Sequence, residues 1–457
     1  MAQLTHTALN NESVKGVPED VRVPGPRPEK AGILHIGAGA FHRAHQAVYT
    51  DDTDWGIICA APRSREVIDA LAAQDGLFTV ATLGPDGAEL RVIGSIVDTL
   101  HLATETERAL ELIASDDIHI VTLTVTEKAY RDPEGVPGLL AEGLARRARR
   151  GGPPLTILCC DNLPDNGKTT RAAVEPLLDG PTRAWAAEHV TFPSTMVDRI
   201  VPASTRATYD RAIETLGLVD AAAVEAEPFL QWVIEDDFAG PRPDWNATFT
   251  TDVAGWEKLK LRTLNGVHSS LAYLGALAGA ETISETLALP GARSFAERLV
   301  AEQIAPSLTP PNGQDVVAYG RSVLERFANP GIRHRCLQIA MDGSQKLPQR
   351  LLGTIADLAE AGRALDLIAL PLAAWIRFCG GKADDGTELP LDDPLAPVLR
   401  QSLAAAGDRA SARVDAILGI RQVVPEPVAS DHRLRRAATA WLGELDRHGV
   451  ARTLEKL

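Results

Sequence analysis

The stretch GILHIGAGAFHRAHQAVYTDD, residues 32–52, decides the fold class of this chain. It opens with an apolar run, passes through Gly37 and Gly39, and continues into a predicted helix. A glycine pair between a strand and a helix permits a tight turn and lets backbone amides approach a pyrophosphate at the helix N-terminus. His42 replaces the third glycine of the GxGxxG pattern, so the motif taken alone leaves a plain tight turn as the alternative.

A zinc site is the third interpretation of this stretch, with His42 and His45 as ligands three positions apart. No further ligand and no acidic base lie near them in the sequence, so we expect these side chains to contact solvent or phosphate rather than a metal. His35 lies inside the apolar run and is expected to be a core histidine.

Short runs rich in Ile, Val and Thr alternate with longer segments rich in Ala, Leu and Arg between about residues 32 and 202. This alternation is typical of βαβ units. Because the short runs are apolar at successive positions, they fit a parallel sheet that is covered on both faces. The expected strands are residues 33–36, 57–61, 118–126, 155–160 and 190–192.

The pattern changes near residue 250, after the threonine-rich segment NATFTTDV. From there the spacing of apolar residues is helical nearly to the end of the chain. We therefore expect an α/β Rossmann-like, doubly wound domain over residues 1–250, followed by a mostly α-helical substrate and catalytic domain over residues 251–457.

Composition limits the classes of partner. With 46 basic and 61 acidic side chains, the formal net charge of -15 disfavours binding to nucleic acid or an anionic membrane. The five cysteines form no CxxC pair, and the first thirty residues of this sequence contain no basic-then-apolar segment, so we expect reduced thiols, a cytoplasmic location and no structural zinc. The oligomeric state is left open.

Two further segments have a structural interpretation. LDLIALPLAAWIRFCGG, residues 365–381, contains two charged residues and a proline, and fits a kinked buried helix better than a membrane span. ARRARRGG, residues 145–152, is expected to be a solvated helix end closed by glycine.

The segment APRSRE, residues 61–66, follows the second expected strand. An NAD-binding domain usually places an acidic residue here, where it accepts hydrogen bonds from the ribose hydroxyls. Glu66 offers that carboxylate, whereas Arg63 and Arg65 offer guanidinium groups for a 2′-phosphate. The sequence therefore leaves both NAD and NADP open.

The segment WEKLKLRTLNGVHSSLAYLG, residues 256–275, groups residues suited to proton transfer. At about 100° per residue in a regular helix, Lys260, Asn265 and His268 fan across less than half the circumference. A desolvated lysine can serve as a base near neutral pH, and an amide can stabilise a developing alkoxide. The alternative is an amphipathic helix with one lysine that reaches out to solvent.

Six segments together resemble the long-chain polyol dehydrogenase family, which is the mannitol dehydrogenase family. They follow one another over roughly residues 32–350 and read GAGAFHRAHQAVYTDD, LTVTEKAY, CDNLPDNG, FPSTMVDRIVP, EPFLQWVIEDDF and KLRTLNGVHSSLAYLG. The resemblance implies metal-free hydride transfer between nicotinamide, as NAD, and the secondary alcohol next to the end of a linear sugar derivative.

The resemblance also implies roles for single residues. Lys260 is the expected catalytic acid/base, and Asn265 with Asn162 forms the expected oxyanion-stabilising pair. His268 would orient the substrate, and Glu257 would link the base to solvent. The residues expected at the cofactor are Gly37, Gly39, Ala40, Phe41, Arg43, Arg63, Glu127 and Asp198, of which Asp198 is also expected beside the substrate.

Three of these residues also have structural interpretations. Asn162 could cap a helix. Asp198 could pair with Arg199, and Glu127 could only fix a loop.

The segment IRHRCLQIAMDGSQKLPQRLL, residues 332–352, resembles the fructuronate reductase branch of the family. Gln338 stands where the mannitol enzymes present an arginine to the polyol, and Arg333, His334, Arg335 and Lys346 could hold a carboxylate. We therefore expect interconversion of D-mannonate and D-fructuronate. The alternative for the RHR segment is a surface turn, with Lys346 as a structural contact.

Two other functions stay open. One is a polyol dehydrogenase for D-mannitol or arabinitol, since the chain is shorter than its relatives between EKAYRDPEG and PPLTILCCDN, which could change substrate choice. The other is a non-catalytic nucleotide-sensing protein, which would have no need of Lys260 as a base.

Overall fold

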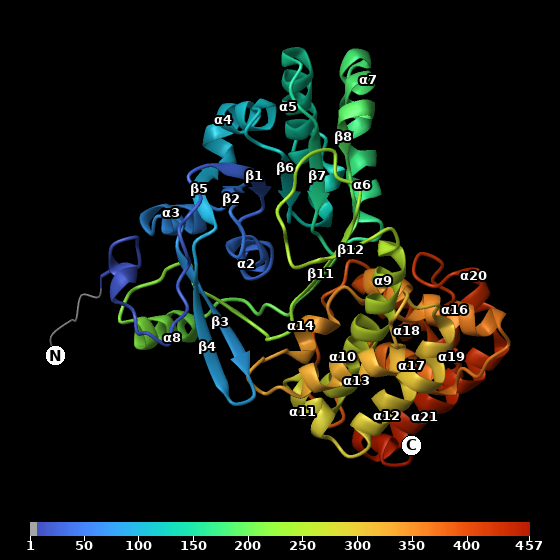
Figure 1. Cartoon of the computed structure of the whole chain (residues 1–457). Helices are drawn as coiled ribbons and strands as arrows, with labels where there is room; N and C mark the ends of the chain where they lie inside the picture. Colours follow the sequence, from blue (N-terminus) through green and yellow to red (C-terminus); the bar gives the residue numbers. More distant parts are fainter. Residues whose placement is uncertain (1–6) are drawn as a thin grey trace. The chain divides into compact units, whose positions relative to one another are not determined.

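The computed structural model describes residues 7–457, and the chain divides into two compact units between Ala254 and Gly255. Figure 1 shows a first unit built around sheets and a second unit built almost entirely of helices. This arrangement confirms the expected α/β class followed by a helix-rich part.

The first unit contains a six-stranded parallel sheet in the order β5-β2-β1-β6-β7-β8. Counted along the chain within this sheet, the order is 3-2-1-4-5-6, that of dinucleotide-binding sheets. All the expected strands are present, although the third ends at residue 123 rather than 126. The strands are β1 (Ala31–Ile36), β2 (Gly56–Ala61), β5 (Ile96–His101), β6 (Ile120–Leu123), β7 (Leu155–Cys159) and β8 (Val190–Thr191).

Both faces of this sheet are buried, as its apolar strands predict. Neighbouring residues such as Ile33 and Leu34 belong to two different core clusters, because successive side chains of a strand point to opposite faces. Ile57 and Ile58 divide between the clusters in the same way. The helices of this unit are α1 (Ala40–Ala44), α2 (Gln46–Asp51), α3 (Glu66–Ala73), α4 (Leu102–Ala114), α5 (Val136–Arg150), α6 (Asn166–Val174), α7 (Gly180–His189) and α8 (Arg206–Leu216), with short 3-10 turns at Ser13–Gly16, Glu127–Arg131 and Glu175–Leu177.

Two small sheets were not predicted. The first joins the antiparallel pair β3 (Phe78–Gly84) and β4 (Gly87–Ile93) to β10 (Val224–Ala226). The second joins β9 (Thr195–Asp198), β11 (Gln231–Glu235) and β12 (Thr248–Thr250). The second sheet holds Asp198 at the carboxyl end of β9.

The second unit packs around α10 (Gly266–Ala278), α17 (Asp366–Cys379) and α21 (His432–Leu454). Helix α17 is the expected buried helix and contains Pro371. No helix in residues 7–457 is long and apolar enough to cross a membrane. The other helical segments are α9 (Val253–Lys260), η4 (Leu261–Asn265), α11 (Ile283–Ala288), α12 (Ala292–Arg298), η5 (Leu299–Ile304), η6 (Ala305–Ser307), α13 (Val316–Ala328), α14 (Cys336–Ala340), α15 (Gly343–Leu347), η7 (Pro348–Leu352), α16 (Gly353–Glu360), α18 (Ala396–Ala406), α19 (Ala410–Leu418) and α20 (Glu426–Ala429).

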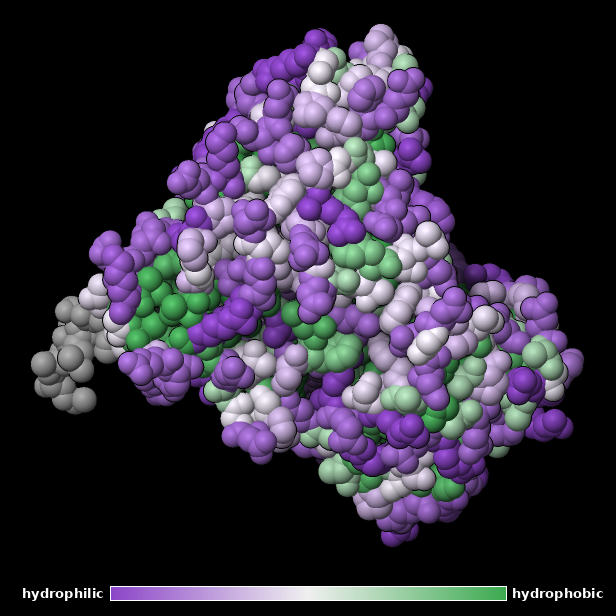
Figure 2. All heavy atoms as spheres, viewed as in Figure 1, coloured by the Kyte–Doolittle hydropathy of each residue, from purple (hydrophilic) through white to green (hydrophobic). Residues whose placement is uncertain are grey.

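The basic end of α5 differs from the prediction at one residue. Gly151 closes the helix at φ 64°, as expected, and hydrophilic residues cover the surface over the neighbouring α4 (Figure 2). Arg147, however, is 0 % exposed, and its guanidinium donates to the carbonyls of Ile113, Ser115 and Ile118 and to those of two prolines further along the chain. This arginine is therefore part of the core and not of the solvated face.

Candidate functional site

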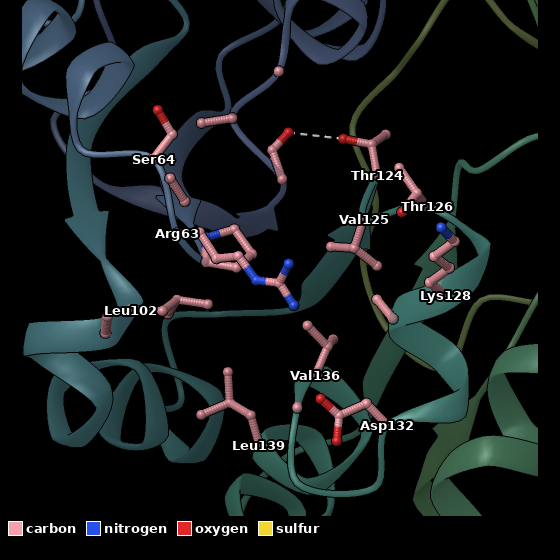
Figure 3. Close-up of a pocket in the computed structure, with 18 of the residues that line it drawn as sticks. Arg63, Ser64, Leu102, Thr124, Val125, Thr126, Lys128, Asp132, Val136 and Leu139 are labelled. Carbon is pink, nitrogen blue, oxygen red and sulfur yellow. Dashed lines mark hydrogen bonds between the residues drawn. The ribbon is translucent and has the colours of Figure 1, made fainter.

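A cavity of about 780 Å³ opens at the carboxyl ends of the central strands of the first unit (Figure 3). Its walls come from the segments after β1, β2, β5 and β6, which is where ligands bind in open α/β sheets. The first half of α5 closes the remaining side.

The glycine turn after β1 forms one wall of this cavity. Gly37 has φ +121°, and a Cβ on it would lie 2.1 Å from the carbonyl oxygen of Thr124. Its N–H donates to the carbonyl of Ala60 over 2.8 Å, and its own carbonyl accepts from the Thr124 hydroxyl over 2.8 Å. Gly39 also lines the cavity, and a Cβ there would meet nothing within 4 Å. The backbone conformation and the close approach of Thr124 thus require glycine at position 37. At position 39 no protein atom occupies the space where a side chain would start.

The residue in place of the third glycine has a different role from the expected one. His42 is 0 % exposed and stacks on His35, with ring centroids 3.3 Å apart. The expectation that His42 contacts solvent or phosphate is therefore wrong. His35 is the predicted core histidine: Thr122 binds one ring nitrogen over 2.7 Å, and the Gly37 carbonyl lies 2.8 Å from the other. Burial lowers the pKa of His35 to about 3, so its ring is neutral.

His45 interrupts the helix predicted after the glycines. Its φ of -127° and ψ of -87° separate α1 from α2, so the first helix is only five residues long. The side chain of His45 is 0 % exposed, and its Nε2 lies 2.9 Å from the carbonyl oxygen of Gln231. Within residues 7–457, no group of three or more His, Cys, Asp or Glu side chains is placed to hold a metal ion.

The expected cofactor residues fall into two groups. Gly37, Gly39, Arg43 and Arg63 line the cavity, although Arg43 is 8 % exposed and donates to the carbonyl of Ala222. The remaining positions lie outside the lining. Among these, Ala40 and Phe41 belong to α1, Glu127 pairs with Arg131, and Asp198 is 3 % exposed at the end of β9.

The end of β2 contributes Arg63 and Ser64 to the cavity, and the Arg63 side chain extends into its middle (Figure 3). Arg65 instead lies 3.5 Å from Asp69 and is not part of the lining. Glu66, the carboxylate considered for the ribose, begins α3 and is also outside the lining.

A strained segment that was not predicted borders the same cavity. Thr126 has φ 74° and ψ 156°, a region that is essentially restricted to glycine. The carboxylate of Asp161 accepts the N–H groups of Val125 and Thr126 over 2.9 and 3.0 Å, and the Tyr130 hydroxyl over 2.6 Å. Asp161 thereby holds the strained backbone in place. Only its position at the end of an apolar strand could have indicated this in the sequence.

Asn162 lies three residues after the end of β7, next to Asp161, and is exposed. Asp165, three residues further on, is the N-cap position of α6.

In the second unit, Lys260 and Asn265 lie at the two ends of a π-helical turn. Lys260 is 7 % exposed at the end of α9, and Asn265 is 8 % exposed at the end of η4. The Gly266 N–H donates to the Leu261 carbonyl, which is the i→i+5 bond of a π-helix. The regular helical spacing assumed for these residues is therefore wrong. A turn that closes on the fifth residue places Lys260 and Asn265 one turn apart.

A cationic cluster lies beside this turn. A Cβ on Gly266 would lie 2.8 Å from the carbonyl oxygen of Arg350, so the backbone at the start of α10 is in close contact with that of η7. Arg350 donates to the Ser269 hydroxyl over 3.0 Å, and Lys346 lies 3.5 Å from the Ile339 carbonyl oxygen. Neither cation forms an ion pair with another described residue. Burial lowers the pKa of Arg350 to about 10, and burial followed by Arg350 itself lowers the pKa of Lys346.

Two histidines adjoin the cluster. His268 stacks on Phe327 with ring centroids 4.6 Å apart, and the ring of His334 lies 5.1 Å from that of His268. Burial lowers the pKa of His334 to about 4 and holds that of His268 well below its ordinary value. Both rings are therefore neutral. The Nε2 atoms of both rings, and Oδ1 of Asn265, are buried without a hydrogen-bond partner in the described part of the chain.

The expected carboxylate-binding residues are thus only partly brought together. His334 and Lys346 adjoin the His268 side of α10, but Arg333 is exposed and donates to Glu281 over 2.9 Å. Gln338 is exposed as well. Arg350, which was not predicted, lies four residues after Lys346 in the segment that carried the resemblance.

The sheet order, the glycine turn and the cavity define a dinucleotide-binding domain of the Rossmann class. Residues 31–247 match the mannitol dehydrogenase Rossmann domain, and residues 252–441 match the mannitol dehydrogenase C-terminal domain. The chain belongs to the mannitol dehydrogenase family, as the sequence motifs predicted.

Similar proteins cover nearly the whole chain. D-mannonate oxidoreductase of Escherichia coli K12 is 39% identical over 94% of this chain and 98% of its own length. Mannitol 2-dehydrogenase of Aspergillus terreus is 33% identical over 93% of both chains. The structure of Pseudomonas fluorescens mannitol 2-dehydrogenase in a ternary complex with NAD and D-mannitol superposes with a TM-score of 0.87 at 32% identity, covering 98% of this chain and 99% of the other. The chain is therefore an oxidoreductase and not a sensing protein without activity.

Proposed function

We propose that this chain catalyses reversible hydride transfer between a nicotinamide dinucleotide, NAD(P), and the secondary alcohol of a linear sugar acid, interconverting D-mannonate and D-fructuronate. The observation that carries the substrate class is the pair of cations Lys346 and Arg350. Both cations are partly buried and repel each other, and neither forms an ion pair with a described residue. Asp342, Asp393 and Asp392 attract Lys346 from a distance, whereas the charge that attracts Arg350 is that of Tyr273, so Arg350 in particular favours an anionic ligand. The E. coli relative named above also acts on mannonate.

The first unit fits the cofactor. The open space beside Gly39 lets backbone approach a pyrophosphate, and the cavity lies where dinucleotides bind. When bound, the nicotinamide supplies the hydride acceptor and donor. Gly37, Gly39 and the residues at the end of β2 would hold its pyrophosphate and ribose.

Lys260 is the proposed acid/base. In oxidation, the substrate C–H bond breaks as the hydride leaves, and the hydroxyl proton passes to the neutral amine of Lys260. Asn265 and Asn162 would donate their amides to the developing oxyanion. Asn265 is buried, and the NH₂ group of its amide is the proposed donor to the oxyanion. Its Oδ1 is buried without a described partner and can accept a hydrogen bond from a substrate hydroxyl.

The remaining site residues have supporting roles. His268, neutral in its buried position, would orient the substrate, while Glu257 would pass the proton to solvent and Asp198 would lie beside cofactor and substrate. No metal is required, because the lysine amine accepts the proton and the amides stabilise the oxyanion.

A substrate matrix tests this proposal. The chain is assayed with D-mannonate, D-mannitol and arabinitol, and in reverse with D-fructuronate and D-fructose, by absorbance of the reduced nicotinamide. We expect the highest kcat/KM for the sugar acid pair. Higher kcat/KM for D-mannitol and D-fructose would refute the sugar acid.

The second candidate is a polyol 2-dehydrogenase. The exposed position of Arg333 and its ion pair with Glu281 favour it, because they remove one of the cations expected at a carboxylate. The same matrix distinguishes the two candidates.

A further inference from the structure

We infer that the cavity recognises the 2′-phosphate of NADP(H) through Arg63 and Ser64, so that this chain binds NADP(H) more tightly than NAD(H). This inference rests on the proposed function only for the reaction that the cofactor serves. The binding itself is argued from the first unit alone.

The end of β2 is placed to meet the adenosine ribose. Strand β2 pairs in parallel with β1, with Ala60 opposite Ile36, and the Gly37 N–H donates to the Ala60 carbonyl. The glycine turn and the segment that starts at Ala61 therefore leave the sheet side by side. In dinucleotide-binding domains, the residue at the end of this second strand contacts the ribose hydroxyls or a phosphate on them.

The residues present there suit a phosphate and not a hydroxyl pair. Arg63 and Ser64 line the cavity, and both offer hydrogen-bond donors. Asp132 and Glu134 are the carboxylate residues of the cavity lining, and they come from the segment before α5 rather than from the end of β2. The acidic residue that would accept hydrogen bonds from an unmodified ribose is thus replaced by a cation.

Arg63 is available to bind a ligand. Its guanidinium extends into the middle of the cavity (Figure 3), and it has no ion pair or side-chain hydrogen bond with any residue from 7 to 457. The His101 ring lies 3.3 Å from the Arg63 carbonyl oxygen, which ties the backbone to β5. A guanidinium held in this way presents two parallel N–H donors to phosphate oxygens.

Arg65 provides an internal contrast. It lies two residues further on but is 3.5 Å from Asp69, one turn along α3, and it is not part of the lining. Its charge also lowers the pKa of Glu105 at the start of α4, after the larger effects of the His101 N–H and Arg108. Of the two arginines, Arg63 is therefore the one assigned to the phosphate, and Arg65 is a matched control.

Calorimetric titration of the full chain tests the inference without turnover. The probes are NADP⁺ and NAD⁺, together with 2′,5′-ADP and 5′-AMP; the members of each pair differ only in the 2′-phosphate. We expect NADP⁺ and 2′,5′-ADP to bind more tightly than their counterparts. Hydrogen bonds to charged groups are strong enough that Arg63→Ala should weaken NADP⁺ binding roughly 10- to 100-fold, with NAD⁺ changed less than about 3-fold.

Control variants distinguish a direct contact from a structural effect. Arg65→Ala should leave the NADP⁺ to NAD⁺ ratio unchanged, and Ser64→Ala should lower it by roughly 2- to 10-fold. Arg63→Lys, which keeps the charge but loses the fork of donors, should fall between Arg63→Ala and the unmodified chain. Circular dichroism confirms that each variant folds.

Several outcomes overturn the inference. Tighter or equal binding of NAD⁺ by the unmodified chain does so, as does an equal loss of both dinucleotides in Arg63→Ala. The proposed reaction fails separately: NADP⁺ binding that depends on Arg63, without turnover of any sugar acid or polyol, refutes the reaction and retains the phosphate site.

Discussion

The glycine turn of the first unit and the π-helical turn of the second unit differ in how their polar groups are satisfied. At the glycine turn itself, the carbonyl of Gly37 and the ring of His35 bind each other and two threonines, although both ring nitrogens of His42, in the helix that follows, are buried without a described partner. At the π-helical turn, Asn265 and His268 have buried atoms without described partners, and two cations adjoin them. Hydrogen bonds therefore fix the backbone of the Gly37 turn without a ligand. Beside the π-helical turn, Oδ1 of Asn265 and Nε2 of His268 can still form hydrogen bonds with a substrate.

Loss of the Lys260 amine should have the largest effect. General acid/base catalysis is worth about 10²- to 10⁴-fold, so we expect Lys260→Ala to lower kcat by that factor while the Kd of the dinucleotide stays nearly constant. Lys258→Ala is the control, because Lys258 lies two residues away, is exposed and pairs with Asp357 over 3.1 Å. Steady-state kinetics measures kcat and titration measures the Kd of the dinucleotide for both variants. An unchanged kcat in Lys260→Ala would rule out Lys260 as the base.

Loss of either cation of the cationic cluster, Lys346 or Arg350, should have the second-largest effect and should change the preference between substrates. Arg350→Ala and Lys346→Ala should each lower kcat/KM for D-mannonate roughly 10- to 100-fold, because each removes a charged hydrogen-bond donor. The loss for D-mannitol should be smaller, since that substrate has no carboxylate. Arg333→Ala is the matched control and should change kcat/KM for either substrate by less than about 3-fold. Equal losses for both substrates in Arg350→Ala would contradict a carboxylate contact.

Alanine substitutions at Gly37 and Gly39 should have different effects: the first should lower stability, and the second should weaken dinucleotide binding. Gly37→Ala combines a positive φ with a Cβ 2.1 Å from the Thr124 oxygen, so we expect a loss of at least about 2 kcal/mol in the free energy of unfolding. Gly39→Ala meets no protein atom within 4 Å and should leave stability within about 0.5 kcal/mol while weakening dinucleotide binding. Urea unfolding and titration measure the two effects. A Gly37→Ala variant as stable as the unmodified chain would contradict the close approach.

Acid should destabilise both units through their neutral histidines. The pKa of His35 is about 3 and that of His334 about 4, both below the ordinary 6.5, so the unfolded chain binds more protons than the folded chain between these values. The stabilisation is fully present above about pH 6.5 and is lost as the pH falls towards 4, by up to about 1.4 kcal/mol per pH unit for each histidine.

Urea unfolding from pH 7 to 4.5 measures this slope. His35→Asn and His334→Asn should each flatten it and so show which unit unfolds first in acid. Slopes identical to that of the unmodified chain would show that these rings do not govern the transition.

The parts of the fold that the sequence predicted depend on local pattern. The apolar strand around Ile33 and the turn at Gly37 follow from composition and backbone geometry, which act over a few residues. The β3–β4 hairpin was missed although the segment Pro85–Gly87 is a turn signal between two strands. The hairpin lies between β2 and β5 of the parallel sheet, where a βαβ pattern predicts a helix rather than two paired strands.

The site was harder to predict where distant segments meet. The stacking of His42 on His35 and the contact of Gly266 with Arg350 join residues whose relation depends on packing and not on spacing. The π-helical turn was missed for a related reason, because periodicity assumes a regular helix. Lys260 and Asn265 were nevertheless found, since their residue types suit proton transfer.

The buried guanidinium of Arg147 ties together two connections that are far apart in the sequence. It binds carbonyls of residues 113–118, which lead from α4 to β6, and of residues 153–154, which lead from α5 to β7. If either connection unfolds locally, some N–H groups of the Arg147 guanidinium lose their carbonyl acceptors while they are still buried in the core. Amide hydrogen exchange should therefore report the two connections as one cooperative unit, with matching protection that Arg147→Met abolishes in both.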